Sequence, residues 1–230
     1  MGIKIDLLKR SIKNPLARFF ISKIFKIEIS NLLKPKIFIH QFDSELIKKD
    51  FLYEFRKKNP ITEYAKPNKH YQTNHNLGDD NRFFSLKKKI EKFLNNEIKN
   101  EFFKNKTLGK FKIKSMWFTM MSQNQTHEIH NHPKSSLSGV YYLTESKDSG
   151  GLNILLPKNN LKKYKEIKET GYDDIELHNE KIKTILIDDL TFYPKKNQMI
   201  IFNSYIYHFV DKYTDTNDRI SIAWDAIYIL

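Results

Sequence analysis

Apolar residues recur at helical spacing in the first half of the chain and at strand spacing in the second half. Between residues 3 and 33 they follow one another at steps of three or four, with lysines between them. This pattern predicts a basic amphipathic helix that bends at Pro15. Asp43 or Ser44 is predicted as the N-cap of a helix that runs to about Lys58. Apolar residues at helical spacing predict a second helix, roughly from Phe84 to Phe103, with Phe84 on its apolar face.

From Lys110 onward the pattern favours short strands, separated by polar turns such as Gly150-Gly151. Residues 59–80 are predicted to be a loop with His70 and His75 at the surface, and residues 158–182 a polar insertion. Either segment could cover a site. The predicted strands span residues 36–40, 111–117, 138–143, 152–157, 184–187, 198–202, 206–210 and 220–228. Helices followed by strands predict an α+β fold with a double-sheet, jelly-roll core.

The chain length suits one large domain, residues 36–230 with a β core at about 110–230, preceded by a helical extension at residues 1–35. We expect the extension to pack on the core, although a basic amphipathic helix can also lie on an anionic membrane surface or contact a partner. No apolar run approaches the roughly 20 residues of a membrane span, and the basic N-terminus lacks the apolar segment of a signal peptide. We therefore expect a cytoplasmic protein.

Composition narrows the candidate chemistry. Without cysteine, a metal site must use His, Asp, Glu or water, which favours iron or manganese over structural zinc. The net charge is +13, but only five of the 40 basic residues are arginines, and a lysine excess beside many isoleucines and asparagines is what AT-rich codons produce. Phosphate-reading surfaces favour arginine, so we do not expect nucleic-acid binding. Arg219 is the only arginine after Arg82.

Three histidines, His127, His130 and His132, fall within six residues, just before a predicted strand. On an extended backbone, His130 and His132 point to the same face, and paired imidazoles are typical of metal sites. A third ligand must come from elsewhere, and His208, in an apolar strand-like run, is the best candidate. We expect the strands of His130 and His208 to face each other across the interior of the sandwich. A cluster that only lines a loop remains the alternative.

Arg219 opens the last predicted strand, which we expect to neighbour the strand of His208. Its planar guanidinium suits a carboxylate, and Ser221, two residues further on the same face, can donate to that carboxylate as well. Tyr142 can supply another hydroxyl group. The alternative is a salt bridge from Arg219 to Asp225 or Asp218.

These motifs, in this order, resemble the 2-oxoglutarate/Fe(II)-dependent oxygenases, in particular those of bacteria and phages and, more distantly, the prolyl hydroxylases. The resemblance covers residues 111–228 and rests on the following segments: His130-Asn131-His132, Ser138–Leu143, Gly150-Gly151, Pro194, Ile200–Ser204, His208 and Arg219–Ser221. It implies a double-stranded β-helix with the N-terminal helices on its larger sheet. It also implies a dioxygenase that uses Fe(II), 2-oxoglutarate and O2 to hydroxylate an unidentified substrate.

By this resemblance, His130 and His208 are iron ligands, and Arg219, Ser221 and Tyr142 hold the far carboxylate of 2-oxoglutarate. One position departs from the family, which usually places Asp or Glu where this chain has His132. Either His132 is a ligand, which we favour, or it lies behind the metal and water takes its place. His127, Asn124 and Ser204 are expected to support the ligands or face the substrate.

Two other functions fit parts of the sequence. One is a cupin-like metal-binding β protein that does not use 2-oxoglutarate. The other is a basic interaction protein that uses residues 1–33 and surface lysines on nucleic acid or membrane. Replacement of Arg219 separates the first from an oxygenase, since only an oxygenase would lose 2-oxoglutarate binding while retaining metal.

Overall fold

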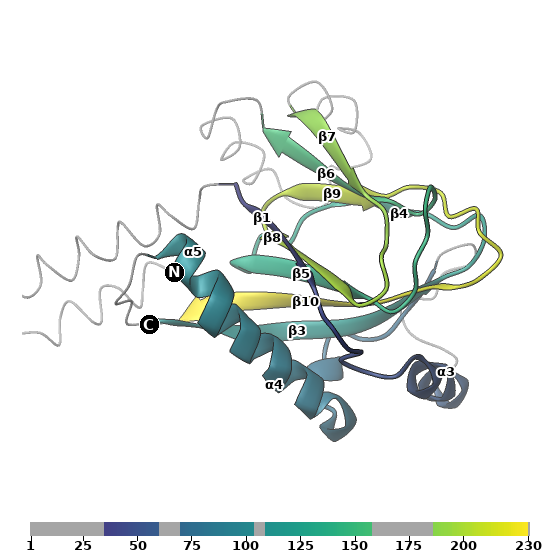
Figure 1. Ribbon diagram of the computed structural model, residues 1–230, viewed down its shortest axis with the longest axis horizontal. Coiled ribbons are helices and arrows are strands. Elements are labelled where there is room, and N and C mark those ends of the chain that lie inside the picture. The colour runs from purple at the N-terminus through teal and green to yellow at the C-terminus, as the bar shows by residue number, and fades with distance from the viewer. Residues whose placement is uncertain (1–34, 60–69, 104–108, 158–185, 230) are drawn as a thin grey trace, which may run out of the picture.

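The computed structural model describes residues 35–59, 70–103, 109–157 and 186–229. These residues form two antiparallel β-sheets, with helices on the outer side of the larger sheet (Figure 1). The structure is rich in β-sheet, and its helices precede most of the strands in sequence, as the residue pattern predicts.

The described part of the larger sheet has six strands in the order β1-β8-β5-β10-β3-β2, and neighbouring strands are antiparallel. Their bounds are β1 (Ile37–Gln41), β2 (Tyr71–Gln72), β3 (Lys110–Met121), β5 (Leu137–Tyr142), β8 (Gln198–Asn203) and β10 (Arg219–Ile229). Because β10 lies between β5 and β3, side chains that it points toward the smaller sheet are enclosed on both sides.

The smaller sheet has four strands within the described residues, in the order β4-β9-β6-β7, again antiparallel. They are β4 (His127–His130), β6 (Leu152–Pro157), β7 (Leu186–Phe192) and β9 (Tyr207–Val210). Of the strand predicted at residues 184–187, residues 184–185 lie outside the described residues and the rest begins β7. This strand continues to Phe192 because it pairs with β6 along its length.

The helical elements are α3 (Lys49–Lys58), the short 3₁₀ helices η1 (Leu77–Asp79) and η2 (Asn81–Phe83), and the consecutive segments α4 (Phe84–Phe93), η3 (Leu94–Ile98) and α5 (Lys99–Phe102). Leu86, Ile90, Leu94 and Ile98 recur at steps of four and are buried in one core with the larger sheet. Each contributes about 1.5–3 kcal/mol by burial. The Asn95 side chain adds hydrogen bonds of 2.9 Å to both backbone groups of Phe111 in β3.

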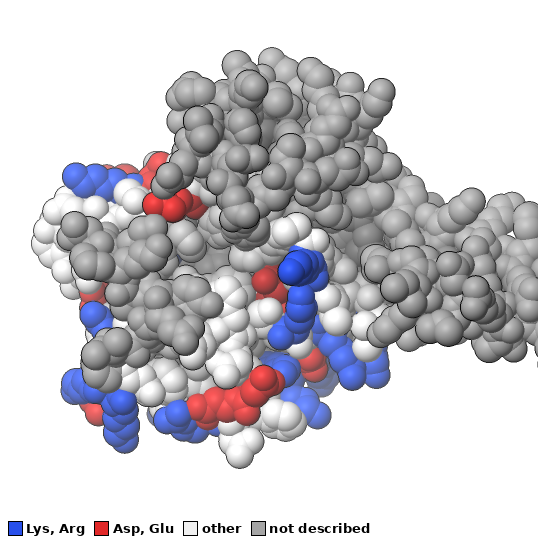
Figure 2. Space-filling model, turned by 180° about the vertical axis from the view of Figure 1, so that it is seen from behind, with Lys and Arg blue, Asp and Glu red and all other residues white. Residues whose placement is uncertain are grey.

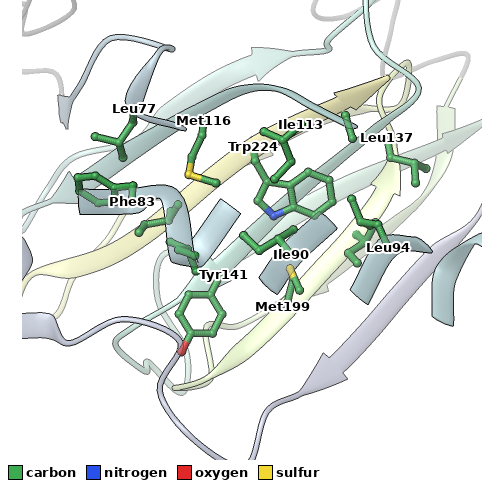
Figure 3. Packing of buried hydrophobic residues seen from close by; sticks show 14 of the residues in the cluster. Leu77, Phe83, Ile90, Leu94, Ile113, Met116, Leu137, Tyr141, Met199 and Trp224 are labelled. Carbon is green, nitrogen blue, oxygen red and sulfur yellow. The ribbon is translucent and has the colours of Figure 1, made fainter. Parts of the chain in front are cut away.

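Successive residues of the larger sheet face two different cores. Tyr141 lies in the core shared with the helices, whereas Tyr142 lies in the core between the two sheets, as the alternation of a strand requires. Met120 and Met121 in β3 divide in the same way. Figure 3 shows the helix-side core around Trp224. The candidate chemistry lies on the other side of the sheet.

Two details of the predicted helices are wrong. The helix predicted to have its N-cap at Asp43 or Ser44 is α3, which has its N-cap at Lys48 and begins at Lys49. The segment before it is held against the core, because the Leu46 backbone N–H donates to the Tyr141 hydroxyl at 2.9 Å. Phe84, which the spacing predicts to lie on the apolar face, is 53% exposed. It stands two residues before Leu86, about 200° around the helix, and therefore faces away from the sheet.

The prediction that His70 lies at the surface is also wrong. His70 directly precedes β2, which pairs with β3, so it is brought to the sheet and is only 7% exposed. Its ring lies 4.4 Å from that of His127, centroid to centroid. His75 is exposed, as predicted, but its ring stacks on Trp117 at 4.5 Å.

The predicted helix at residues 3–33 and the whole predicted insertion at residues 158–182 lie outside the described residues. In the described part, no helix is both long enough and apolar enough to cross a membrane.

Figure 2 shows one face on which basic side chains alternate with acidic ones. Among the described residues, ion pairs such as Lys196–Glu45 and Lys87–Asp79 join side chains of opposite charge. The expectation that the chain does not bind nucleic acid stays a prediction.

Candidate functional site

Three imidazoles converge between the two sheets. The β4–β9 register makes His130 and His208 direct partners, with ring centroids 4.2 Å apart. His132 follows β4 by two residues, and its ring lies 5.1 Å from that of His130 and 5.2 Å from that of His208. One ring nitrogen from each residue lies within 4.8 Å of the others. The residues predicted as metal ligands are therefore brought together.

Hydrogen bonds fix which nitrogen of each ring is free. Nδ1 of His130 lies 2.7 Å from the Glu128 carbonyl oxygen, and Nδ1 of His208 lies 3.0 Å from the Ile206 carbonyl oxygen. A carbonyl oxygen only accepts, so each Nδ1 carries the proton and each Nε2 keeps its lone pair. Nδ1 of His132 lies 3.1 Å from a carboxylate oxygen of Asp225. All three rings can thus present Nε2 to a metal, with the other nitrogen engaged.

Burial favours the neutral form of the His130 and His208 rings. Burial, together with the neighbouring imidazoles, lowers the pKa of His130 to about 3 and that of His208 well below its ordinary value. The pKa of His127 is also lowered well below its ordinary value, chiefly by burial. Because a metal binds only the unprotonated ring, little proton competition is expected from His130 and His208 at neutral pH.

Arg219 is the buried cation of the site and is only 3% exposed. Its Nε donates to the Gly150 carbonyl oxygen at 3.0 Å, and one terminal nitrogen donates to the Tyr142 hydroxyl at 3.3 Å. The guanidinium also lies over the Tyr142 ring, 5.0 Å from its centroid. Burial lowers the pKa of Arg219, yet a guanidinium stays charged in proteins.

The alternative salt bridge is not formed among the described residues, where no carboxylate oxygen lies within 4.0 Å of the Arg219 guanidinium. Asp218 accepts from the Ser122 hydroxyl at 2.9 Å, and Asp225 pairs with His132. Transfer of a cation into a protein interior is costly without an anion nearby. The site thus retains an unused capacity to bind an anion.

The histidines and the arginine line one cavity of about 50 Å³. Ser221 and Tyr142 are register partners in the β10–β5 pair and also line it.

Two predicted relationships need correction. His130 and His208 lie on neighbouring strands of one sheet rather than on opposite sides of the sandwich. Arg219 lies in the opposite sheet and does not neighbour the strand of His208.

The remaining predicted residues lie at different depths. His127 lines the cavity, with its ring 4.3 Å from that of His130. Ser204 is fully buried, and its carbonyl oxygen accepts from the His132 backbone N–H at 2.7 Å, so it holds the loop of a candidate ligand. Asn124 sits at an exposed turn with φ 71° and is not among the cavity-lining residues.

Two residues near the candidate ligands were not predicted from the sequence: Asp225, which contacts His132, and His70, whose ring lies beside that of His127. Asp225 follows Arg219 by six residues and Ser221 by four, so strand alternation places all three on one face of β10. That signal was available in the sequence. The approach of His70 could not be predicted, because it depends on the pairing of the two-residue strand β2 with β3.

Comparisons with known proteins agree with the resemblance seen in the motifs. Residues 115–225 match the sequence model of the family described as "Putative 2OG-Fe(II) oxygenase". The resemblance to 2-oxoglutarate/Fe(II)-dependent oxygenases is therefore confirmed. Among curated proteins, none matches the chain.

Several solved structures have a similar fold. The non-heme alpha ketoglutarate dependent carbocyclase SnoK from nogalamycin biosynthesis superposes with a TM-score of 0.58 at 8% identity, over 86% of this chain and 82% of that one. HygX from Streptomyces hygroscopicus, with nickel and 2-oxoglutarate bound, superposes with a TM-score of 0.54 at 11% identity, over 86% of this chain and 85% of that one. A viral collagen prolyl hydroxylase from Paramecium Bursaria Chlorella virus-1, in complex with 2-oxoglutarate, superposes with a TM-score of 0.50 at 15% identity, over 83% of this chain and 95% of that one. At such identities the likeness is one of fold.

Proposed function

We propose, from the match of residues 115–225 to the 2-oxoglutarate/Fe(II) oxygenases, that the chain is an Fe(II)- and 2-oxoglutarate-dependent dioxygenase. The observation that carries this proposal is the presence of three convergent imidazoles and a buried arginine, free of any described carboxylate partner, in one cavity. The three imidazoles suit a metal ion, and the buried arginine suits a dicarboxylate.

The donor set fits iron. His130, His132 and His208 would hold the ion through Nε2, since each Nδ1 is already engaged. Imidazole nitrogen is a suitable ligand for Fe(II), and three protein ligands leave positions open for other molecules. With His132 as a ligand, the usual carboxylate of this enzyme class is replaced by a neutral group.

The opposite part of the cavity fits the far carboxylate of 2-oxoglutarate. Arg219 would pair with that carboxylate, and the hydroxyl groups of Tyr142 and Ser221 would donate to it. Gly150 holds the guanidinium in place through its carbonyl oxygen. Binding of the cosubstrate by the metal at one end and by Arg219 at the other would fix its orientation before the reaction. These residues would thereby lower the entropic part of the activation barrier.

When bound, the iron supplies the oxidative chemistry, in which 2-oxoglutarate is decarboxylated and O2 is consumed. The protein supplies position and a shaped, water-poor pocket. Hydroxylation of a substrate C–H bond is the outcome that we propose. His127, on the cavity wall beside His130, would face the substrate or support the ligands.

The same proposal covers the architecture. The two sheets would form a double-stranded β-helix with the metal between them, and the helices around α4 would stiffen its larger sheet. The oxygenase domain would comprise residues 36–230, with the β core at about 110–230 and residues 1–35 as a basic extension.

The proposal is tested by isothermal titration calorimetry, in which 2-oxoglutarate is added to Mn(II)-loaded protein without O2 and its dissociation constant is measured. Arg219→Ala should weaken 2-oxoglutarate binding at least about tenfold, because a charge-assisted hydrogen bond contributes roughly 1.5–3 kcal/mol, while Mn(II) binding is retained. Arg82→Ala is the matched control, since Arg82 pairs with Asp80 on the surface. Metal binding without any 2-oxoglutarate binding in the unmodified protein would favour the cupin-like alternative.

A further inference from the structure

Among the described residues, Asp225 is the acidic side chain with an oxygen within 4.0 Å of a ring nitrogen of a candidate ligand. It is 6% exposed, and one of its oxygens lies 3.1 Å from Nδ1 of His132. The other oxygen accepts a hydrogen bond of 2.6 Å from the Ser138 hydroxyl. Both oxygens are therefore engaged, which fixes the orientation of the carboxylate.

The backbone supports this arrangement. Asp225 is in register with Ser138 across the β10–β5 pair, and the pairing of β10 with β3 shifts immediately after Asp225. Such an irregularity re-aims the adjacent side chain. Arg219, Ser221, Ala223 and Asp225 alternate along one face of β10. The first three line the cavity, and Asp225, further along the same face, contacts His132 at Nδ1.

The position of this carboxylate bears on the departure at residue 132. Three neutral imidazoles leave an Fe(II) site one unit more positive than two imidazoles and a carboxylate. A carboxylate that accepts the Nδ1 proton of a ligating imidazole makes that ring a stronger donor and moves negative charge toward the metal. Asp225 is placed to do this for His132 and, because it is buried, acts there with little screening by water.

We propose that Asp225 is a positioning residue that returns, through His132, the negative charge that the three-histidine site lacks. This inference rests on the proposed metal centre. It assigns His132 as a ligand whose basicity is set by Asp225, and it makes the pair His132–Asp225 the functional counterpart of a single carboxylate ligand.

The test is the dissociation constant for Co(II), measured by titration calorimetry and by visible absorption. Asp225→Asn keeps the size of the side chain and an oxygen that can accept from Nδ1, but it removes the charge. It should weaken Co(II) binding about 10–100-fold, the usual cost of losing such a partner. Asp225→Glu, which keeps the charge, should bind Co(II) more tightly than Asp225→Asn. Asp148→Asn, at an exposed position, removes a charge elsewhere and should bind like the unmodified protein.

A second readout separates charge from ring orientation. In the Fe-loaded protein, Asp225→Asn should raise the Fe(III)/Fe(II) reduction potential, because less negative charge reaches the metal. Co(II) binding by Asp225→Asn within about twofold of the unmodified protein, or an unchanged potential, would overturn the inference. If Asp225→Asn does not fold, as judged by circular dichroism, Asp225→Ser serves as the neutral variant under the same criteria.

The two proposals fail in different ways. If His130→Ala and His208→Ala bind Co(II) as well as the unmodified protein, the metal centre itself is wrong, and the role of Asp225 falls with it. If those variants lose Co(II) while Asp225→Asn keeps it, the metal centre stands and only the role of Asp225 is overturned.

Discussion

His130 and His208 are direct partners in the β4–β9 pair, and their ring centroids lie 4.2 Å apart. Side chains of directly opposed residues leave the sheet on the same side, with Cβ atoms about 4.5–5.5 Å apart. Two of the three candidate ligands are thus placed by backbone pairing rather than by loops. The third, His132, lies beyond the end of β4 and depends on Ser204 and Asp225 for its position.

Arg219→Met should make the metal-free protein more stable. The guanidinium is buried with no described carboxylate partner, so its desolvation on folding costs free energy that no ion pair offsets. An apolar side chain of similar length removes this desolvation cost. We expect the free energy of unfolding in urea to rise by about 1–3 kcal/mol, at the expense of cosubstrate binding. Arg82→Met, at the surface, should change it by less than about 1 kcal/mol. A fall in stability for Arg219→Met would mean that the charge is compensated in the metal-free protein.

Ala223→Leu should block the cosubstrate and leave the metal. Ala223 lines the cavity between Ser221 and Asp225 on β10. A larger side chain there occupies the space between the arginine and the histidines, so 2-oxoglutarate affinity should fall at least about tenfold, the effect of about 1.4 kcal/mol. Calorimetry of the Mn(II)-loaded protein measures this.

The control is Ala226→Leu on the opposite face of the same strand. Ala226 is fully buried in the helix-side core. Overpacking there should lower the free energy of unfolding by about 1–3 kcal/mol and leave 2-oxoglutarate affinity in the folded protein unchanged. Equal losses of affinity in the two variants would contradict the location of the cosubstrate.

Gly150→Ala should disturb Arg219 from the backbone side. Gly150 has φ +60°, and an added Cβ would lie 2.7 Å from the Tyr213 ring and 3.0 Å from Cδ of Arg219. The strained backbone alone costs about 1–2 kcal/mol, and the displaced guanidinium should weaken 2-oxoglutarate binding. Gly151→Ala would meet Thr191 and Tyr193 instead, so it should lower thermal stability without changing that affinity. Unaltered binding in Gly150→Ala would show that the guanidinium is held by other contacts.

The metal-free protein should lose stability as the pH falls from about 7 to about 5. Burial lowers the pKa values of His127, His130 and His208, whereas the unfolded chain binds protons on these rings below about 6.5. The unfolded state therefore binds more protons in this range, and the free energy of unfolding falls by up to about 1.4 kcal/mol per pH unit for each ring. Urea unfolding at several pH values measures the slope. His127→Asn should make it shallower, and a slope of zero would contradict the assigned burial.

The residue pattern predicts the strands well, because alternation along β3, β5 and β10 follows directly from which side chains each face buries. The pattern carries less information on pairing. His130 and His208 are correctly grouped, yet they are neighbours in one sheet, a relationship set by hydrogen bonds between distant segments. The start of α3 is likewise decided by a tertiary contact, from Leu46 to Tyr141. The burial of His70 has the same kind of origin.

The central claim is that one cavity binds Fe(II) and 2-oxoglutarate together, and visible absorption under anaerobic conditions tests it most directly. Adding Fe(II) and then 2-oxoglutarate to the unmodified protein should produce a metal-to-ligand charge-transfer band. His208→Ala should lack the band, and Arg219→Ala should need at least about tenfold more 2-oxoglutarate to produce it. A protein that binds Fe(II) but gives no band at saturating 2-oxoglutarate would contradict the account.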